Sequence, residues 1–188
     1  MVRCFSDGLM NQNQGGFMNY PIPIETTASY CEMDKQFMRL AILEAEKAST
    51  QGEVPVGAVL IQRNQILATG HNEREWRQDP MAHAEVAVIQ RAASRLNSWR
   101  LEDTTLYVTL EPCLMCAGAI LQARITRLVI GTMDPKAGAC GSLFSVHQDF
   151  RLNHQVSVQS GVLEEPCRTL LQTFFRRLRQ SDMTSEPH

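Results

Sequence analysis

Two short segments of the sequence carry side chains that commonly bind metals. One contains His83 and, two residues later, Glu85; the other contains Cys113 and Cys116, with Pro112 directly before the first cysteine. We expect a helix to begin at each segment. Cysteines three residues apart lie on the same side of a helix, so both sulfur atoms can bind one ion. The free N–H groups and partial positive charge of a helix N-terminus also favour the thiolate that a metal requires.

The combination of imidazole and thiolate groups is typical of zinc sites. His83, Cys113 and Cys116 supply three ligands, and no fourth histidine or cysteine has a matching spacing. Three protein ligands leave one position for water, as in catalytic zinc sites, and zinc lowers the pKa of bound water to roughly 7. Glu85 is near enough to move protons without being a ligand. We interpret the other cysteines and histidines as non-ligands: Cys4, Cys31, Cys140, Cys167, His71, His147, His154 and His188.

Each part of this pattern has a simpler interpretation when it is taken alone. Cys113 and Cys116 could be a redox pair or two core cysteines. A single histidine is more often an ordinary core or surface residue, and Glu85 could simply be a favourable charge in a first helical turn. The joint pattern favours the metal site, because H-x-E followed by P-C-x-x-C, each at a helix start, is typical of zinc-dependent nucleobase deaminases.

The composition excludes several classes of protein. The 188 residues include 18 Lys and Arg against 20 Asp and Glu, which gives a net charge of −2. A broadly basic surface for nucleic acid is therefore excluded, although a local basic patch is not. No apolar run approaches the roughly 18 residues of a membrane span, and the first residues lack a secretory pattern. We therefore expect a cytoplasmic protein without a membrane partner.

Apolar periodicity predicts an alternation of helices and strands. Helices are expected from Asp34, as N-cap, to near Gly52, from near His83, over the segment EPCLMCAGAILQA with Pro112 near its first turn, and from about Glu165 to Gln180. Strands are expected at 56–62, 65–70, 104–110, 127–131 and 156–159, with the first two joined by a turn at Arg63 and Asn64. This alternation predicts an α/β sheet that is covered by helices on both faces.

The chain divides into three regions. Residues 1–32 are rich in Asn, Gln, Gly, Pro and Thr and show no periodicity, so we expect a disordered extension. Alternatively, translation begins at Met33. Residues 33–180 are expected to form one domain, and residues 181–188 a flexible tail.

Five longer segments resemble the bacterial tRNA-specific adenosine deaminase family, within the cytidine deaminase-like superfamily. They are MDKQFMRLAILEAEKA, EVPVGAVLI, HAEVAVI, TLYVTLEPCLMCAGAI and GTMDPKAGACGSL. The resemblance covers roughly residues 33–180. The superfamily shares H-x-E and P-C-x-x-C, so these motifs alone do not define the substrate; EVPVGAV, TLYVTLEPCxMCAGA and the D-P-K loop are more particular.

The resemblance implies a fold, an activity and a cofactor. The fold is a three-layer α/β/α sandwich with a central five-stranded mixed sheet. The activity is hydrolytic deamination of adenosine to inosine at the wobble position of tRNA anticodons. One Zn²⁺ per subunit is implied on His83, Cys113 and Cys116, with Glu85 as the catalytic proton shuttle. The resemblance also implies that residues 33–180 are the zinc-dependent deaminase domain and that the protein is a homodimer.

The same resemblance implies contacts to the tRNA anticodon stem-loop. Asn72 would hydrogen-bond the adenine, and Asp134 and Lys136 would contact RNA beside the flipped nucleotide. Asn72 could instead be an ordinary turn residue.

The last helix is implied in RNA binding as well. Phe174, Phe175 and Arg179 would place it against the anticodon loop. The two phenylalanines could equally be core residues, and the arginine part of a solvated helix end that favours its own dipole.

Three alternative functions remain open from the sequence. A deaminase of free bases or nucleosides (guanine, cytosine or cytidine) would use the same zinc chemistry, and so would an RNA-editing cytidine deaminase. A non-enzymatic, zinc-stabilised RNA-binding module is the third, but it would need a fourth protein ligand.

Overall fold

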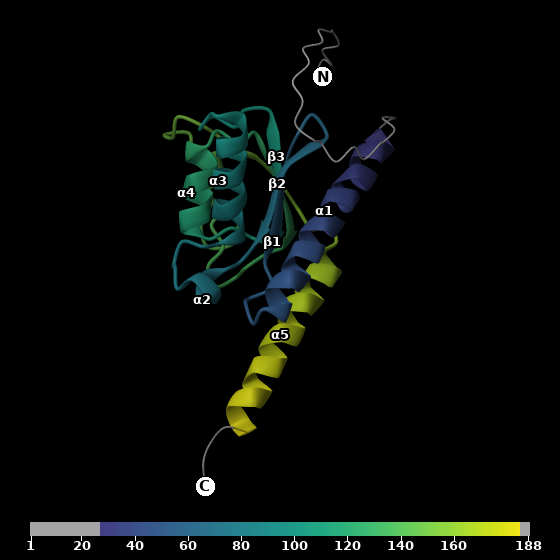
Figure 1. Cartoon of the computed structure of the whole chain (residues 1–188). Helices are drawn as coiled ribbons and strands as arrows, with labels where there is room; N and C mark the ends of the chain where they lie inside the picture. The colour runs from purple at the N-terminus through teal and green to yellow at the C-terminus, as the bar shows by residue number, and fades with distance from the viewer. Residues whose placement is uncertain (1–26, 185–188) are drawn as a thin grey trace.

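A five-stranded mixed sheet lies between two layers of helices (Figure 1). The computed structural model describes the backbone of residues 27–184 and the side chains of residues 32–180. The strands are β1 (Gly57–Gln62), β2 (Gln65–His71), β3 (Thr104–Leu110), β4 (Arg127–Thr132) and β5 (Ser157–Ser160). Their order is β2-β1-β3-β4-β5; β1 is antiparallel to both neighbours, whereas β3, β4 and β5 are parallel. This arrangement confirms the predicted α/β sandwich with a mixed sheet.

The helices cover both faces of the sheet. They are α1 (Thr27–Thr50), α2 (Arg74–Arg77), α3 (Ala84–Leu96), α4 (Leu114–Gln122) and α5 (Glu164–Thr184), with one 3₁₀ turn at Val146–Gln148. The helices α3 and α4 cover one face and α1 and α5 the other (Figure 1). None of the helices in the described part of the chain is long and apolar enough to cross a membrane.

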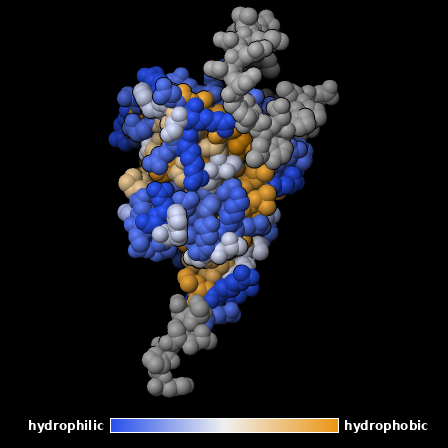
Figure 2. Space-filling view, viewed as in Figure 1, coloured by the Kyte–Doolittle hydropathy of each residue, from blue (hydrophilic) through white to orange (hydrophobic). Residues whose placement is uncertain are grey.

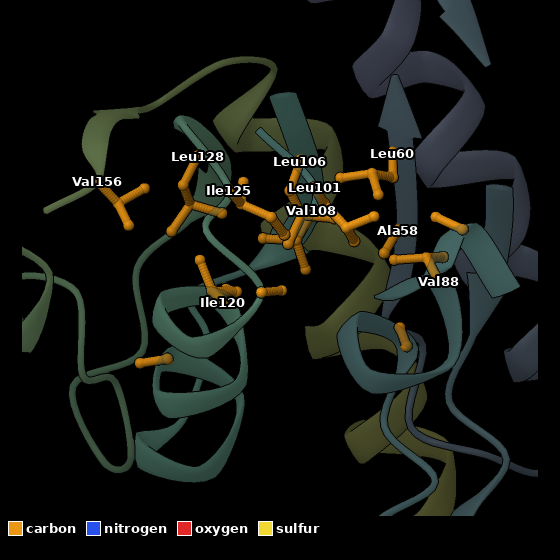
Figure 3. Close-up of a cluster of buried hydrophobic side chains, with 14 of the residues drawn as sticks. Ala58, Leu60, Val88, Leu101, Leu106, Val108, Ile120, Ile125, Leu128 and Val156 are labelled. Atoms are coloured by element: carbon orange, nitrogen blue, oxygen red, sulfur yellow. The ribbon is translucent and has the colours of Figure 1, made fainter. Parts of the chain in front are cut away.

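A hydrophobic core lies on each side of the sheet. Leu106 and Val108 of β3 face α3 and α4, where they pack in the cluster that Figure 3 shows. Tyr107, between them, packs against Phe37 of α1 in the second cluster. Successive side chains of a strand point to opposite faces, so a strand that is buried on both faces reads as one continuous apolar run. This geometry explains why residues 104–110 were recognisable in the sequence.

The helix α1 begins earlier than predicted. Its first residue is Thr27, so Asp34 lies inside the helix and the prediction of an N-cap there is wrong. The buried Asp34 carboxylate accepts two hydrogen bonds from Arg127 of β4, at 2.8 and 2.7 Å, and one from the Tyr107 hydroxyl at 2.8 Å. Asp34 therefore connects α1 to the sheet instead of starting the helix.

Both ends of β1 show local features that fit the sequence. A Cβ atom at Gly57 would lie only 2.0 Å from the Ala41 carbonyl oxygen, so the missing side chain lets α1 pack closely on the strand. At the other end of β1, Arg63 and Asn64 both have positive φ angles, 49° and 63°. A two-residue hairpin turn of this kind matches the twist of the strands, and the predicted hairpin is confirmed.

The remaining elements differ from the sequence prediction only locally. Cys113 is the N-cap of α4, so Pro112 lies directly before the cap, near the first turn of the helix as predicted. The short helix α2 and the 3₁₀ turn were not predicted, because four and three residues are too short to show periodicity. The predicted extension and tail lie outside the described residues over 1–26 and 185–188, as do Cys4 and His188.

Candidate zinc centre

The three predicted metal ligands meet at one end of the sheet. His83 is the N-cap of α3, and Cys113 is the N-cap of α4, three residues after β3 ends. Cys116 lies in the first turn of α4, on the same side as Cys113. Both helices begin where the sequence predicted, so two helix N-termini face one point.

The spacing of the three donor atoms fits tetrahedral zinc. His83 Nδ1 lies 3.7 Å from Cys113 Sγ and 3.5 Å from Cys116 Sγ, and all three atoms lie within 4.8 Å of one another. Zinc bonds of about 2.3 Å to sulfur and about 2.0 Å to nitrogen give a nitrogen–sulfur edge of about 3.5 Å in a regular tetrahedron. No fourth side chain joins this group within the described residues. The geometry therefore suits a zinc ion with one coordination position free for a small molecule.

The protonation of the two thiols also suits a metal. A hydrogen bond from Cys116 and the proximity of His83 lower the pKa of the Cys113 thiol to about 4. The hydrogen bond to Cys113, together with burial, raises the pKa of Cys116. Without metal the pair therefore holds one proton, and a bound cation would displace it, because both ligands must be thiolates.

Glu85 lies close to the three predicted metal ligands but does not belong to their group. It belongs to the first turn of α3 and is only 4% exposed. Burial raises the pKa of its carboxyl group above the ordinary value, since the ionised form loses solvation. A carboxyl group with a raised pKa accepts a proton more readily than an exposed glutamate does, as a proton shuttle must.

A pocket opens next to the ligands. Its walls contain Val54, Val56, Asn72, Arg74, His83, Ala84, Glu85, Leu110, Glu111, Cys113, Asp134 and Ala137. Its volume of about 150 Å³ is below the range of about 300–1,000 Å³ typical of pockets for drug-sized ligands. A pocket of this size suits one flat heterocycle rather than a whole nucleotide.

Asn72 lies in this pocket, and Glu53 fixes its orientation. Its side-chain Nδ2 donates a hydrogen bond of 2.8 Å to Glu53 Oε2, and Glu53 is fully buried. Because a carboxylate accepts and does not donate, the amide nitrogen of Asn72 must face Glu53. The second Glu53 oxygen accepts a hydrogen bond of 2.7 Å from the Trp76 backbone N–H.

Glu111 is a second buried carboxylate of the pocket wall. Its buried carboxylate accepts hydrogen bonds from the backbone N–H groups of Asp134, Cys140 and Ser142, at 2.9, 2.9 and 3.0 Å, and from the Ser142 hydroxyl. Burial alone would raise the pKa of Glu111, but these hydrogen bonds hold it below the ordinary value. A Cβ atom at Gly138 would overlap Glu111 Oε2. Glu111 thus holds the loop of residues 134–142, which carries Asp134 and Ala137 into the pocket wall.

The other predicted RNA contacts lie outside the pocket lining. Lys136 is exposed beside the pocket residue Asp134, whose Oδ1 accepts a hydrogen bond of 2.9 Å from the Lys136 backbone N–H. Phe174, Phe175 and Arg179 belong to α5, which projects past the sheet at the end where α2 lies (Figure 1). The two phenylalanine rings meet edge to face at 5.4 Å.

The projecting part of α5 presents apolar and charged side chains together. Phe175 is 41% exposed and Phe174 is half-buried, so neither is a fully buried core residue. Figure 2 shows apolar side chains beside hydrophilic ones on this part of the helix. The helix α5 that carries these residues projects at the site end of the molecule, and none of the three lines the pocket.

Sequence reasoning did not identify Glu53 or Glu111 as site residues. Both lie in segments that resemble the deaminase family, EVPVGAVLI and TLYVTLEPCLMCAGAI. The available signal was a single carboxylate next to an otherwise apolar strand, where an unpaired charge would be costly. Their partners are mostly backbone N–H groups of distant segments, which a sequence pattern does not reveal.

Comparisons with known proteins identify the family of the chain. A family model described as MafB19-like deaminase matches residues 32–179. The tRNA-specific adenosine deaminase of Bacillus subtilis (strain 168) is 52% identical over 147 residues, which cover 78% of this chain and 91% of that protein.

Solved structures extend the comparison. A structure from a study of A-to-I editing by tRNA:A34 deaminases is 43% identical, with a TM-score of 0.70 over 72% of this chain and 99% of that one. The guanine deaminase of Bacillus subtilis is 34% identical, with a TM-score of 0.52 over 57% of this chain and 69% of that one. With the zinc-type donor set and the mixed sheet, these relationships establish that the chain belongs to the tRNA-specific adenosine deaminase family, within the MafB19-like deaminases.

Proposed function

We propose that this protein converts adenosine to inosine at the wobble position of a tRNA anticodon. The observation that carries the proposal is the group of His83, Cys113 and Cys116 beside the buried Glu85, in a chain that is 52% identical to a tRNA-specific adenosine deaminase. The reaction consumes one water molecule and releases ammonia. The C6–N bond of adenine breaks, and the oxygen of water becomes the carbonyl oxygen of inosine.

The cofactor in this proposal is one Zn²⁺ ion per subunit. His83 Nδ1 and the two thiolate sulfur atoms would hold it, as their spacing allows. When bound, zinc supplies the Lewis acidity that makes water nucleophilic at neutral pH.

Glu85 is the proton carrier of the proposed reaction. Its carboxylate takes a proton from water, gives it to adenine N1, and then transfers a second proton to the departing amine. Its raised pKa and its burial support this role, because the proton is held away from bulk solvent between transfers.

The pocket would receive only the base. Asn72 and Asp134 lie on its walls and are the proposed hydrogen-bonding partners of the adenine and its neighbouring atoms. The base must leave the anticodon stack to enter, which costs little in a loop whose bases are already largely unpaired. Outside the pocket, we propose that Lys136, Phe174, Phe175 and Arg179 contact the anticodon stem-loop.

The proposal extends to assembly and location. We propose a homodimer in the cytoplasm, where tRNA is processed. Leu114 and Leu152 support association of two copies, because they line one groove beside α4 and are 54% and 44% exposed. Sedimentation of the purified protein should give twice the mass of one chain; a monomer at working concentration would contradict the dimer.

Deamination of a free base is the second candidate function. The 34% identity to the guanine deaminase of Bacillus subtilis favours it, since that relative shares the fold. A pocket for a single heterocycle could also accept a base that is not part of RNA.

Ammonia release distinguishes these functions. The zinc-loaded protein is given an anticodon stem-loop with adenosine at the wobble position, and separately adenosine, guanine, cytosine and cytidine. We expect a much higher kcat/KM for the stem-loop than for any free compound. Higher efficiency with guanine would support the free-base deaminase instead, and zinc binding without any turnover would support the RNA-binding module.

A further inference from the structure

Trp76 is a large apolar side chain that the fold leaves in solvent. It belongs to the short helix α2 and is 75% exposed. Isolated exposed hydrophobic residues are common, so exposure alone says little. Trp76 is of interest because its backbone lies close to the pocket.

The backbone of Trp76 is tied to the pocket through one carboxylate. Glu53 Oε1 accepts a hydrogen bond from the Trp76 N–H at 2.7 Å, and Glu53 Oε2 accepts one from the Asn72 side chain at 2.8 Å. Arg74, two residues before Trp76, lines the pocket itself. The indole therefore starts from the rim of the pocket, next to the residue proposed to bind the adenine.

The segment that carries the indole is held at both ends. It runs from Asn72, in the pocket, to the proposed zinc ligand His83. The Glu73 N–H donates to the Ala82 carbonyl at 2.9 Å, which closes the segment into a loop. A segment held at both ends in this way loses little conformational freedom when a ligand binds to it.

The charges on α2 are balanced by their neighbours. Arg74 pairs with Glu75 at 2.9 Å, and Arg77 pairs with Glu73 at 3.3 Å. Attraction of phosphate groups is therefore not the main chemistry that α2 offers. Its distinctive feature is the aromatic surface of the indole.

We propose that Trp76 stacks on an unpaired nucleobase directly adjacent to the adenosine that occupies the pocket. This inference rests on the proposed function. When the target base enters the pocket, its neighbours lose a stacking partner, and an exposed aromatic ring at the rim can replace it. Stacking of a base on an aromatic side chain tolerates any sequence, because every base has a π-face.

The chain supplies a matched control for this proposal. Its two tryptophans are Trp76 and Trp99. Trp99 is 58% exposed but follows the C-terminus of α3, where the Arg100 guanidinium lies 4.7 Å from the ring centroid. The 13 residues of α3 separate it from the zinc centre by about 20 Å, at about 1.5 Å per residue.

Binding of a wobble-adenosine stem-loop to the zinc-loaded protein tests the proposal. Trp76→Ala should raise the Kd by about 5- to 150-fold, the range for loss of one base–aromatic stack, while the zinc content is unchanged. Trp76→Phe should restore most of the affinity, and Trp99→Ala should bind as the wild type does. The salt dependence of binding should not change in Trp76→Ala, because no phosphate contact is lost.

Abasic stem-loops identify the stacked base. With an abasic site on the contacted side of the adenosine, Trp76→Ala should cause no further loss of affinity. In Trp99→Phe, where Trp76 is the sole indole, binding of the intact stem-loop should quench the fluorescence, and the abasic form should not.

Two results would overturn the proposal, and they differ from a failure of the proposed function. One is a Trp76→Ala protein that binds the stem-loop as tightly as the wild type does. The other is a Trp76→Ala substitution that lowers the affinity equally for the intact stem-loop and for a stem-loop that lacks both bases flanking the adenosine. A wild-type protein that does not deaminate the stem-loop would contradict the proposed function and the stacking role together. Normal wild-type turnover with unaffected Trp76→Ala binding would contradict the stacking role alone.

Discussion

His83 and Cys113 occupy helix N-cap positions, but their side chains do not cap the helices. Both are helix N-caps, where Ser, Thr, Asp or Asn usually accepts a hydrogen bond from the helix. Neither side chain makes such a bond. The capping contribution of about 1 kcal/mol is given up at each helix, and the donor atoms remain free to meet Cys116. The helix N-termini then face the thiolates with their positive ends.

Removal of any one ligand should release the metal. We expect His83→Ala, Cys113→Ser and Cys116→Ser each to lose stoichiometric zinc and activity, because each removes one of the three proposed protein ligands. Metal content of the purified proteins by plasma mass spectrometry measures this. Cys140→Ala is the matched control, since Cys140 is buried near the site but outside the donor group, and it should keep its zinc. A full zinc equivalent in any of the three ligand variants would refute the assignment.

Glu85 should be needed for chemistry and not for metal binding. Glu85→Gln is expected to keep zinc and stem-loop affinity but to lower kcat by about 10²- to 10⁴-fold, the usual contribution of a general acid–base group. Inosine formation in single-turnover experiments and metal content are the measurements. Loss of zinc from this variant would instead make Glu85 a ligand.

At the scale of elements, buried carboxylates connect segments that are far apart in the chain. Glu111 follows β3 and holds the loop of residues 134–142, while Glu53 precedes β1 and holds the segment after β2. Asp34 connects α1 to β4 in the same manner, across 93 residues. Two parts of the pocket wall are therefore loops, and each is held by a hydrogen-bonded carboxylate that lies close to the end of a strand.

Glu111→Gln should loosen the loop of residues 134–142. All the hydrogen-bond partners of Glu111 are donors, so the NH₂ group of a glutamine would face N–H or O–H groups and leave at least one of them unpaired. We expect faster amide hydrogen exchange in peptides of this loop, with zinc retained. Ser142→Ala, which removes a single hydroxyl donor, should cause a smaller change. Unaltered protection in Glu111→Gln would show that the loop is held by other contacts.

The elements themselves were largely predictable, because their signals are local. The strand at 104–110 is a continuous apolar run, and the hairpin has a short polar turn at Arg63 and Asn64. The start of α1 was not predictable in this way. Asp34 resembles an N-cap by residue type, but its carboxylate binds Arg127, a partner that only the folded sheet brings near. His83, Cys113 and Cys116 were predicted because they lie in short local motifs. The roles of Glu53 and Glu111 were not, because their hydrogen-bond partners are brought near only by the folded chain.

At the scale of the whole molecule, a net charge of −2 must be reconciled with a polyanionic substrate. Many arginines are already engaged within the protein: Arg127 pairs with Asp34, and Arg91 pairs with Glu73. The proposed RNA surface is thus small, with Lys136 beside the pocket and Arg179 on the part of α5 that projects past the site (Figure 1). Few phosphate contacts are expected, so shape and base recognition must supply most of the specificity.

Salt dependence measures this small electrostatic surface. Lys136→Ala and Arg179→Ala should each weaken stem-loop binding and reduce the slope of log K against log salt by about 0.7, the value for one phosphate contact on a single strand. Neither change should affect zinc content. Arg100→Ala, at the far end of α3, is the control and should leave the slope unchanged. Equal slopes in the wild type and the three variants would place the RNA elsewhere on the surface.

Inosine mapping in a complete tRNA is the most direct test of deamination at the wobble position. A tRNA transcript with adenosine at the wobble position is incubated with the zinc-loaded protein, and each adenosine is read as A or as inosine by reverse transcription and sequencing. We expect conversion of the wobble adenosine alone, and none in a parallel reaction with Glu85→Gln. No conversion, conversion spread over other loop adenosines, or undiminished conversion by Glu85→Gln would contradict this expectation.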